Sequence, residues 1–180
     1  VLDNKILVSD IMQNKIFSFE LDGKLYGYFG SQQNPDGFFV KPSKVTVSDT
    51  HVFVLDTVMK TIQKFDNQGK FVSSVNPAVL EKIGITNPTS VDYYDKKLYV
   101  VDSVASKVAV LTEAGDVVLT FGEYGSSDGE FIFPNDISAF KDIIAVCDSG
   151  NSRIQVFTQD GKWKKTFGTF GKADGQILAA

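Results

Sequence analysis

Residues 143–157 read IIAVCDSGNSRIQVF, and residues 158–168 continue as TQDGKWKKTFG. A short apolar run comes first and ends at Asp148. Ser, Gly and Asn follow, and they predict a turn because they tolerate left-handed or side-chain-capped backbone. Residues 153–157 then alternate between apolar and polar side chains, which is typical of a half-buried strand. An Asp-Gly pair at residues 160–161 predicts a hairpin into the next strand. The stretch therefore predicts three short strands joined by tight turns.

The same pattern recurs along the chain with a period of 46 residues, without insertion or deletion. Three kinds of residue mark the period, namely strand-ending aspartates, hairpin glycines and prolines: Asp10, Asp56, Asp102 and Asp148; Gly23, Gly69, Gly115 and Gly161; Pro42, Pro88 and Pro134. One more strand follows each proline, so each repeat holds four. Apolar residues recur at every second position rather than at spacings of three and four residues, and this pattern argues against helical repeats. Only residues 78–83 have a helical pattern.

Four antiparallel strands repeated every 40 to 50 residues or so indicate a β-propeller blade. We therefore predict an all-β fold, a β-propeller of four-stranded antiparallel blades with four blades in this chain. We expect one domain over residues 1–180, with blade repeats at roughly 1–42, 43–88, 89–134 and 135–180.

A family resemblance rests on the same residues. Residues 148–157, followed by Asp160-Gly161 and Phe167-Gly168, resemble an NHL repeat, and residues 129–134 resemble the linker that leads into the next blade. The resemblance covers the whole chain and is looser in the second repeat, where Val75-Asn76 replaces Phe-Gly. It implies a propeller that usually has about six blades. Proteins with similar propellers include protein binders, RNA binders, sensor ectodomains and a few lyases or lactonases, so the fold alone does not give the function.

The number of repeats differs from that of the family. The chain opens on a segment equivalent to the second strand of a blade, so we expect the first blade to lack its innermost strand. Three interpretations follow: the chain is part of a longer one, other copies or another subunit complete the ring, or four blades close by themselves. An open set of blades would expose unpaired strand edges and apolar blade faces.

Composition disfavours two classes of partner. The formal net charge is −4 and the pI is near 5.0, whereas nucleic-acid binding needs a surplus of Lys and Arg on one face. No segment approaches the ~20 apolar residues of a membrane span. Cys147 is the only cysteine, so no internal disulfide forms. The NHL resemblance favours an extracellular or cell-envelope location.

Residues with catalytic chemistry are sparse. The single histidine, His51, cannot build a zinc site alone, and Cys147 has no histidine at a related position. We therefore predict no catalytic, cofactor-binding or metal-binding residue, with a structural calcium ion as the one alternative. The repeated aspartates are expected to cap turns by accepting backbone N–H bonds, and Arg153 to pair with a nearby carboxylate. These residues and the repeated glycines are predicted to be structural.

Binding is predicted where the repeat is broken, because the needs of the blade do not explain those residues. Lys44, Ser90 and Asp136 occupy one equivalent position after each proline and differ in chemistry. Linker loops at residues 32–36, 76–87 and 123–127 also differ. The candidate interaction surface adds three tyrosines, which are residues that often anchor partners: Tyr93, Tyr94 and Tyr124.

The leading functional hypothesis is a non-catalytic NHL-type propeller that serves as a scaffold, binding another protein or assembling with its neighbours. One alternative is a fragment of a six-bladed propeller hydrolase or lyase whose metal ligands lie outside this chain. A second alternative is an RNA-binding NHL surface, which the acidic charge disfavours.

Overall fold

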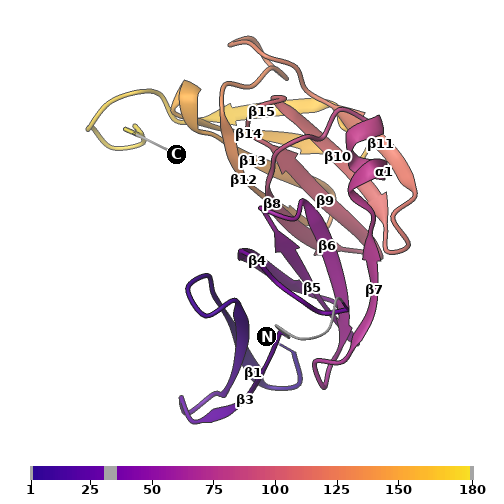
Figure 1. Cartoon of the computed structure of the whole chain (residues 1–180). Helices are drawn as coiled ribbons and strands as arrows, with labels where there is room; N and C mark the ends of the chain where they lie inside the picture. The colour runs from indigo at the N-terminus through magenta and orange to yellow at the C-terminus, as the bar shows by residue number, and fades with distance from the viewer. Residues whose placement is uncertain (1, 31–35, 179–180) are drawn as a thin grey trace. The chain divides into compact units, whose positions relative to one another are not determined.

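The computed structural model describes residues 2–30 and 36–178. Its secondary structure is almost entirely β, in four antiparallel sheets (Figure 1). Contacts divide the chain into two compact units, unit 1 at residues 1–77 and unit 2 at residues 78–180. The predicted all-β propeller fold is confirmed, and each unit holds two blades.

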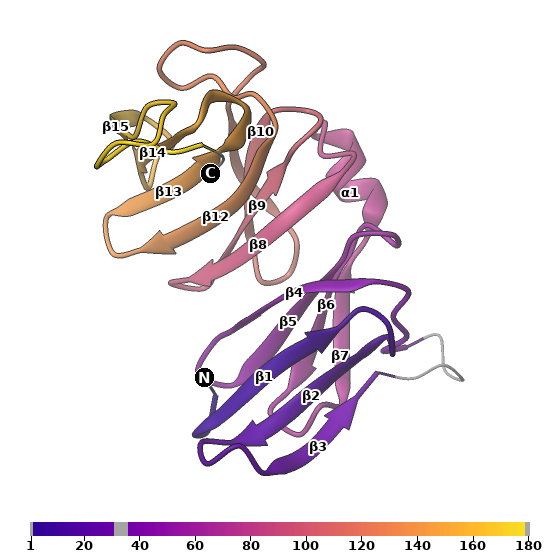
Figure 2. The same ribbon diagram turned by 90° about the vertical axis from the view of Figure 1, so that its left-hand side faces the viewer.

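Unit 1 contains blade 1 and blade 2, which Figure 2 shows as two meandering sheets. Blade 1 has three strands among the described residues, in the order β1-β2-β3, and blade 2 has four, in the order β4-β5-β6-β7. The strands are β1 (Lys5–Asp10), β2 (Lys15–Glu20), β3 (Leu25–Phe29), β4 (Pro42–Val47), β5 (His51–Asp56), β6 (Thr61–Asp66) and β7 (Phe71–Val75).

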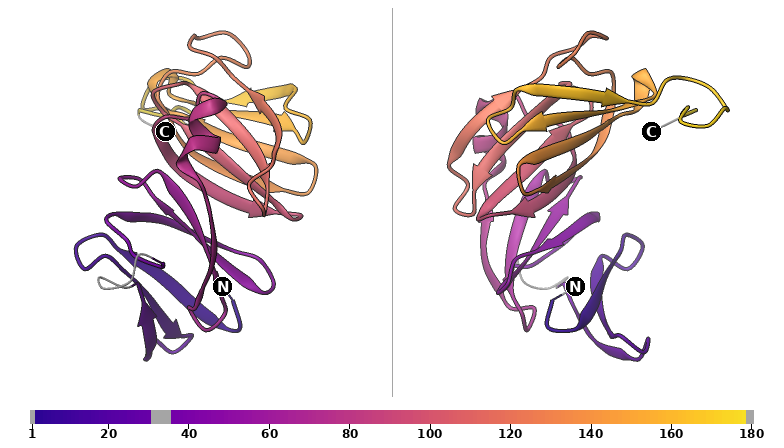
Figure 3. Two further views of the ribbon diagram at one scale, coloured as in Figure 1. Left: turned by 45° about the vertical axis from the view of Figure 1, so that its right-hand side comes forward. Right: turned by 180° about the vertical axis from the view of Figure 1, so that it is seen from behind.

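Unit 2 contains blade 3 and blade 4, each with four strands in chain order (Figure 3). The short helix α1 (Pro77–Lys82) follows β7 in the chain, where the sequence has its one helical pattern. The elements after it are β8 (Pro88–Tyr94), β9 (Lys97–Asp102), β10 (Lys107–Thr112), β11 (Val117–Phe121), β12 (Pro134–Phe140), β13 (Ile143–Asp148), the 3₁₀ turn η1 (Ser149–Asn151), β14 (Arg153–Thr158) and β15 (Trp163–Phe167).

Prolines and aspartates set the register at one end of each complete blade. Pro42, Pro88 and Pro134 each open the first strand of a blade, a position where a missing N–H is tolerated. Each proline lies opposite the aspartate that ends the second strand, and the register shifts directly after it. This bulge lets the chain leave the linker and enter the sheet.

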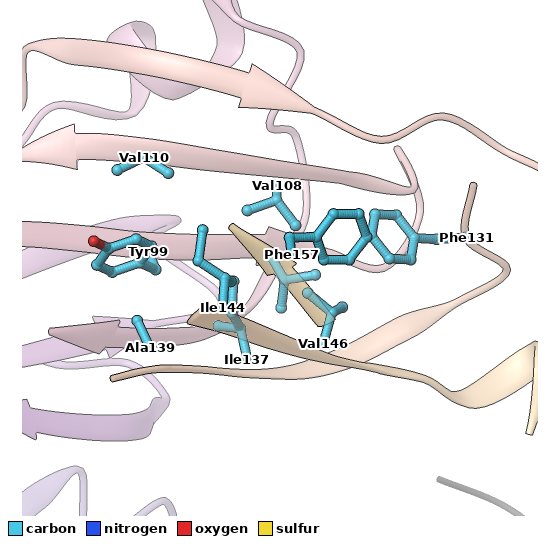
Figure 4. Packing of buried hydrophobic residues seen from close by; sticks show 10 residues of the cluster. Tyr99, Val108, Val110, Phe131, Ile137, Ala139, Ile144, Val146 and Phe157 are labelled. Atoms are coloured by element: carbon cyan, nitrogen blue, oxygen red, sulfur yellow. The ribbon is translucent and has the colours of Figure 1, made fainter. Parts of the chain in front are cut away.

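The core of each unit lies between its two blades. In unit 2, Tyr99, Val108 and Val110 of blade 3 pack against side chains of blade 4 (Figure 4). The Phe157 ring lies 5.5 Å from that of Phe131, a residue of the linker between the blades. In unit 1, the Phe65 ring lies 4.8 Å from that of Phe29 and 5.4 Å from that of Phe39. Blade-to-blade packing therefore holds each unit together.

Candidate functional site

The repeated aspartates connect turns to linkers. Asp56 is fully buried, and both of its carboxylate oxygens accept backbone hydrogen bonds. Oδ1 accepts from Val58 and Met59 in the turn that follows, at 3.0 and 2.9 Å. Oδ2 accepts from Val40 and Lys41 in the linker before the blade, at 2.6 and 2.9 Å. Four N–H donors compensate for the loss of water around the buried carboxylate.

One other member of the series repeats this arrangement and one varies it. Asp102 is also fully buried and accepts four backbone N–H groups, from Thr86, Asn87, Val104 and Ala105. Among the described residues, the backbone N–H groups that donate to Asp10 are those of Gln13 and Met12 in its own turn. Those two donors lower the pKa of Asp10 below its usual value. Both carboxylates cap the turn that follows them.

Asp148 replaces most of the backbone donors by side chains. Its Oδ2 accepts from Arg153 Nε at 2.7 Å, and its Oδ1 accepts from the Ile132 backbone N–H at 2.8 Å. Arg153 also donates to three carbonyl oxygens of the linker loop before blade 4: Ser126, Ser127 and Glu130. The ion pair therefore fastens this loop to blade 4.

The hairpin glycines mark close contacts between blades. A Cβ on Gly69 in blade 2 would lie 2.7 Å from the Phe29 ring of blade 1. A Cβ on Gly161 in blade 4 would lie 2.9 Å from the Phe121 ring of blade 3. Gly23, at the equivalent turn of blade 1, has nothing within 4 Å among the described residues. All three glycines have positive φ, so the turn needs glycine even where the neighbouring blade does not.

The predicted interaction residues of unit 2 fall in separate places. Ser90 is buried, and its Oγ donates to Asp136 Oδ1 at 2.5 Å, so these two meet between β8 and β12. Tyr93 and Tyr94 lie at the far end of β8, where Tyr93 Oη donates to Glu113 Oε1 at 2.6 Å. Tyr124 lies in the linker loop and is 72% exposed.

One predicted residue belongs to unit 1. Lys44 is on β4 of unit 1. Residues 32–35 of the first linker loop lie outside the described residues. The structure therefore brings Ser90 and Asp136 together within unit 2.

One sheet face in unit 1 exposes apolar side chains whose equivalents in the next blade are buried. Ile6 and Val8 on β1 are 41% and 44% exposed, whereas the equivalent Val52 and Val54 of blade 2 are 2% and 0% exposed. Phe17 and Phe19 lie opposite these residues on β2, in the pairs Val8–Phe17 and Ile6–Phe19. We call these four side chains the blade-1 face.

The blade-1 face adjoins an open strand edge. Among the described residues β1 is the edge strand of its sheet, whereas the equivalent β5 pairs on both sides. A hollow with an empty volume of about 500 Å³ lies beside this edge, lined by Ile6 and Leu7 of β1 and by three residues of β4: Val45, Thr46 and Val47. The sequence predicts open faces in general for an incomplete ring, but it does not single out these residues, because their periodicity matches that of buried equivalents.

Residues capable of metal or nucleophile chemistry are dispersed. His51 Nδ1 lies 2.8 Å from Thr50 Oγ1 in a turn, and Cys147 is partly buried on β13. Within residues 2–30 and 36–178, no group of three His, Cys, Asp or Glu side chains is arranged to hold a metal ion. In the same ranges, no helix has the length and apolar character needed to cross a membrane.

Comparisons with known proteins agree with the fold. A family model described as a 6-bladed beta-propeller matches residues 80–166. No curated protein matches the sequence.

Solved structures resemble the chain in shape. A streptogramin B lyase has 18% identity and a TM-score of 0.67, covering 90% of this chain and 50% of its own. Hydrazine synthase of Kuenenia stuttgartiensis has 12% identity and a TM-score of 0.65, and the match covers 91% of this chain and 45% of that protein. Virginiamycin B lyase of Staphylococcus aureus has 16% identity and a TM-score of 0.63, and the match covers 89% of this chain and 50% of that protein.

Identities this low show the fold and not the activity. The chain spans about half the length of these solved structures. Repeat pattern, sheet topology, family model and neighbours agree on one architecture: the chain is a β-propeller protein built of four-stranded antiparallel blades.

Proposed function

We propose that this chain is a non-catalytic NHL-type propeller module that binds another polypeptide, either a partner protein or a neighbouring copy. The observation that carries the proposal is the exposure of Ile6 and Val8, whose equivalents in blade 2 are buried. Apolar side chains at these positions normally pack against a neighbouring blade, so a blade of another polypeptide can cover them. The NHL-like residues at 148–157 support the finer family assignment, which favours an extracellular or cell-envelope setting.

The blade-1 face offers two kinds of contact at once. An added strand can pair with the open edge of β1 through backbone hydrogen bonds, as peptides do when they extend a sheet. A second blade can cover Ile6, Val8, Phe17 and Phe19, as blade 1 covers the equivalent face of blade 2. Full burial of a large apolar side chain contributes about 1.5–3 kcal/mol, before the cost of association is subtracted.

Light scattering coupled to size exclusion tests this proposal on the whole chain. We expect discrete species heavier than the 19.7 kDa monomer, or capture of a blade-like partner. The double variant Ile6→Lys with Val8→Lys should shift the distribution to monomer, because two ammonium groups resist burial in an apolar interface. Val72→Lys is the matched control, since Val72 is exposed on β7 outside the blade-1 face.

Either of two results would contradict the proposal. One is a cooperatively folded monomer of 19.7 kDa that binds no polypeptide. The other is association that the double variant and Val72→Lys weaken equally, because the blade-1 face would then have no special part in it.

A further inference from the structure

A second feature of unit 1 is a pocket between its two blades. Its empty volume, which includes space open to solvent, is about 510 Å³. Leu2, Leu7, Phe29 and Val52 provide apolar walls, and Lys5 is among the polar lining residues. Two of its lining residues, Leu7 and Ser18, are on the opposite side of blade 1 from the blade-1 face.

The pocket exists because one row of side chains is small. Leu7, Ser18 and Gly27 face one another across β1, β2 and β3, in the pairs Leu7–Ser18 and Ser18–Gly27. The equivalent row of blade 3, which packs into the core of unit 2, is made of larger residues: Tyr99, Val110 and Leu119. Figure 4 shows Tyr99 and Val110 in that filled interface.

The loss of volume occurs at all three positions of the row. In blade 1 a leucine stands where blade 3 has a tyrosine, a serine where it has a valine, and a glycine where it has a leucine. A Cβ built on Gly27 meets nothing within 4 Å, so the space beside it is open. A hollowed blade interface costs stability, because apolar walls lose packing contacts. A bound molecule restores those contacts.

Ser18 gives the pocket a specific polar feature. Its side chain is 8% exposed, and its Oγ has no hydrogen-bond partner among the described residues. A buried hydroxyl without a partner costs about 1–3 kcal/mol, so few folded proteins retain one without reason. Because Ser18 lines the pocket, a ligand hydroxyl or carbonyl can supply the missing hydrogen bond.

Lys5 places a positive charge at the same pocket. Its Nζ lies 3.5 Å from the centre of the Tyr26 ring, and both residues line the pocket. Lys5 is two residues from Leu7 on β1, and Leu7 is opposite Ser18. Lys5 and Ser18 are therefore diagonal neighbours on one sheet face, and residues in that relation usually lie about 7–8 Å apart. Two carboxylates lie nearby: Glu20 is opposite Lys5 on β2, and Asp3 accepts a hydrogen bond from Asn67 Nδ2 at 2.8 Å.

We propose that this pocket binds a small apolar acid, with its ring or branched hydrocarbon between the blades, its carboxylate at Lys5 and a hydroxyl or carbonyl at Ser18. The apolar walls supply most of the affinity and the two polar groups fix the orientation. The inference goes beyond polypeptide binding and does not depend on it.

The experiment is an amide chemical-shift titration of the whole chain with 4-hydroxyphenylacetate, a ring that carries a hydroxyl and a carboxylate at opposite ends. We expect saturable shifts at residues 5–7, 18, 27 and 52. Phenylacetate should bind more weakly because it cannot satisfy Ser18, and 4-hydroxyphenylacetamide because it lacks the charge that meets Lys5.

Variants that restore the filled row test the site. Ser18→Val with Gly27→Leu should weaken binding at least about tenfold, because these residues occupy the space as in blade 3. Thr61→Val is the matched control: Thr61 Oγ1 is another buried hydroxyl that has no hydrogen-bond partner in the described part of the chain, and Thr61 does not line the pocket. It should leave the dissociation constant unchanged within about twofold.

Ser18→Val alone keeps the inference testable where the double variant folds poorly. It should abolish the preference for 4-hydroxyphenylacetate over phenylacetate. The inference is overturned by absence of saturable shifts, by undiminished binding to a folded double variant, or by a hydroxyl preference that survives Ser18→Val. Equal affinity for the acid and its amide overturns the role of Lys5.

Discussion

Asp148 and Arg153 form a partly buried ion pair that also fastens a loop. We expect Asp148→Asn to lower the free energy of unfolding by about 3–5 kcal/mol, because it leaves the Arg153 charge without its partner. Chemical denaturation measures this loss. Asp160→Asn is the control, since its pair with Lys162 is exposed and exposed pairs contribute little. Equal effects of the two substitutions would contradict a special role for Asp148.

Tyr99 predicts a pH dependence. Burial, followed by the nearby charge of Asp95, raises the pKa of Tyr99 from its usual value of 10.0 to about 12. The folded state therefore favours the neutral phenol, and the stabilisation is complete below pH 10 and is lost as the pH rises towards 12. The stability difference between the wild type and Tyr99→Phe should shrink over that window. Other groups titrate there too, so this difference is the quantity to measure.

Single residues differ in how far the sequence reveals them. The period of 46 predicts capping aspartates, since every blade repeats the same turn. Ser18 is different, because its hydroxyl is informative only through the absence of a partner, which depends on packing across a second blade. Its place in the row with Leu7 and Gly27 becomes visible only when strand register is known.

At the scale of elements, two hairpin turns of unit 1 provide a matched comparison. Gly23 and Gly69 share positive φ, but only Gly69 approaches another blade, with a Cβ 2.7 Å from Phe29. Gly23→Ala should cost about 1–2 kcal/mol for backbone strain. Gly69→Ala should cost about 1–3 kcal/mol more, because the added methyl overpacks the blade interface. Equal losses in thermal or chemical unfolding would show that φ alone explains the glycine repeat.

Strands and turns were predictable because their signals are local. Alternation at two residues predicts the strands, and Asp-Gly or Ser-Gly-Asn turns predict their ends. The contact of Gly69 with Phe29 joins residues 40 positions apart in sequence, so spacing marks the glycine without giving its reason. Linker loops break the repeat, so the periodicity gives no expectation of where their side chains lie.

At the scale of the whole molecule, the repeat predicts the architecture but not which faces are covered. All blades share one apolar pattern, because each blade normally has a neighbour on both sides. Ile6 therefore resembles Val52 in sequence, although it is 41% exposed and Val52 is 2% exposed. Coverage depends on the blades that are present, and this information lies outside any single repeat.

The nature of the blade-1 face predicts how association responds to salt. Its four members are apolar, and the chain carries a net charge of −4. Raising sodium chloride from about 0.05 to about 0.5 M should therefore leave polypeptide association unchanged or strengthen it, because screening removes repulsion between like-charged chains. Sodium sulfate should strengthen it further, since sulfate favours apolar burial.

Nucleic-acid binding gives the opposite response, because counterion release makes affinity fall steeply as salt rises. Two measurements distinguish apolar polypeptide association from nucleic-acid binding. One is light scattering across the salt series, and the other is a parallel titration with a labelled single-stranded RNA. The double variant Ile6→Lys with Val8→Lys supplies the internal test, since it removes apolar area and adds positive charge together. Loss of polypeptide association in this variant supports an apolar contact. Association that collapses in high salt in the wild type contradicts it and revives the RNA-binding alternative.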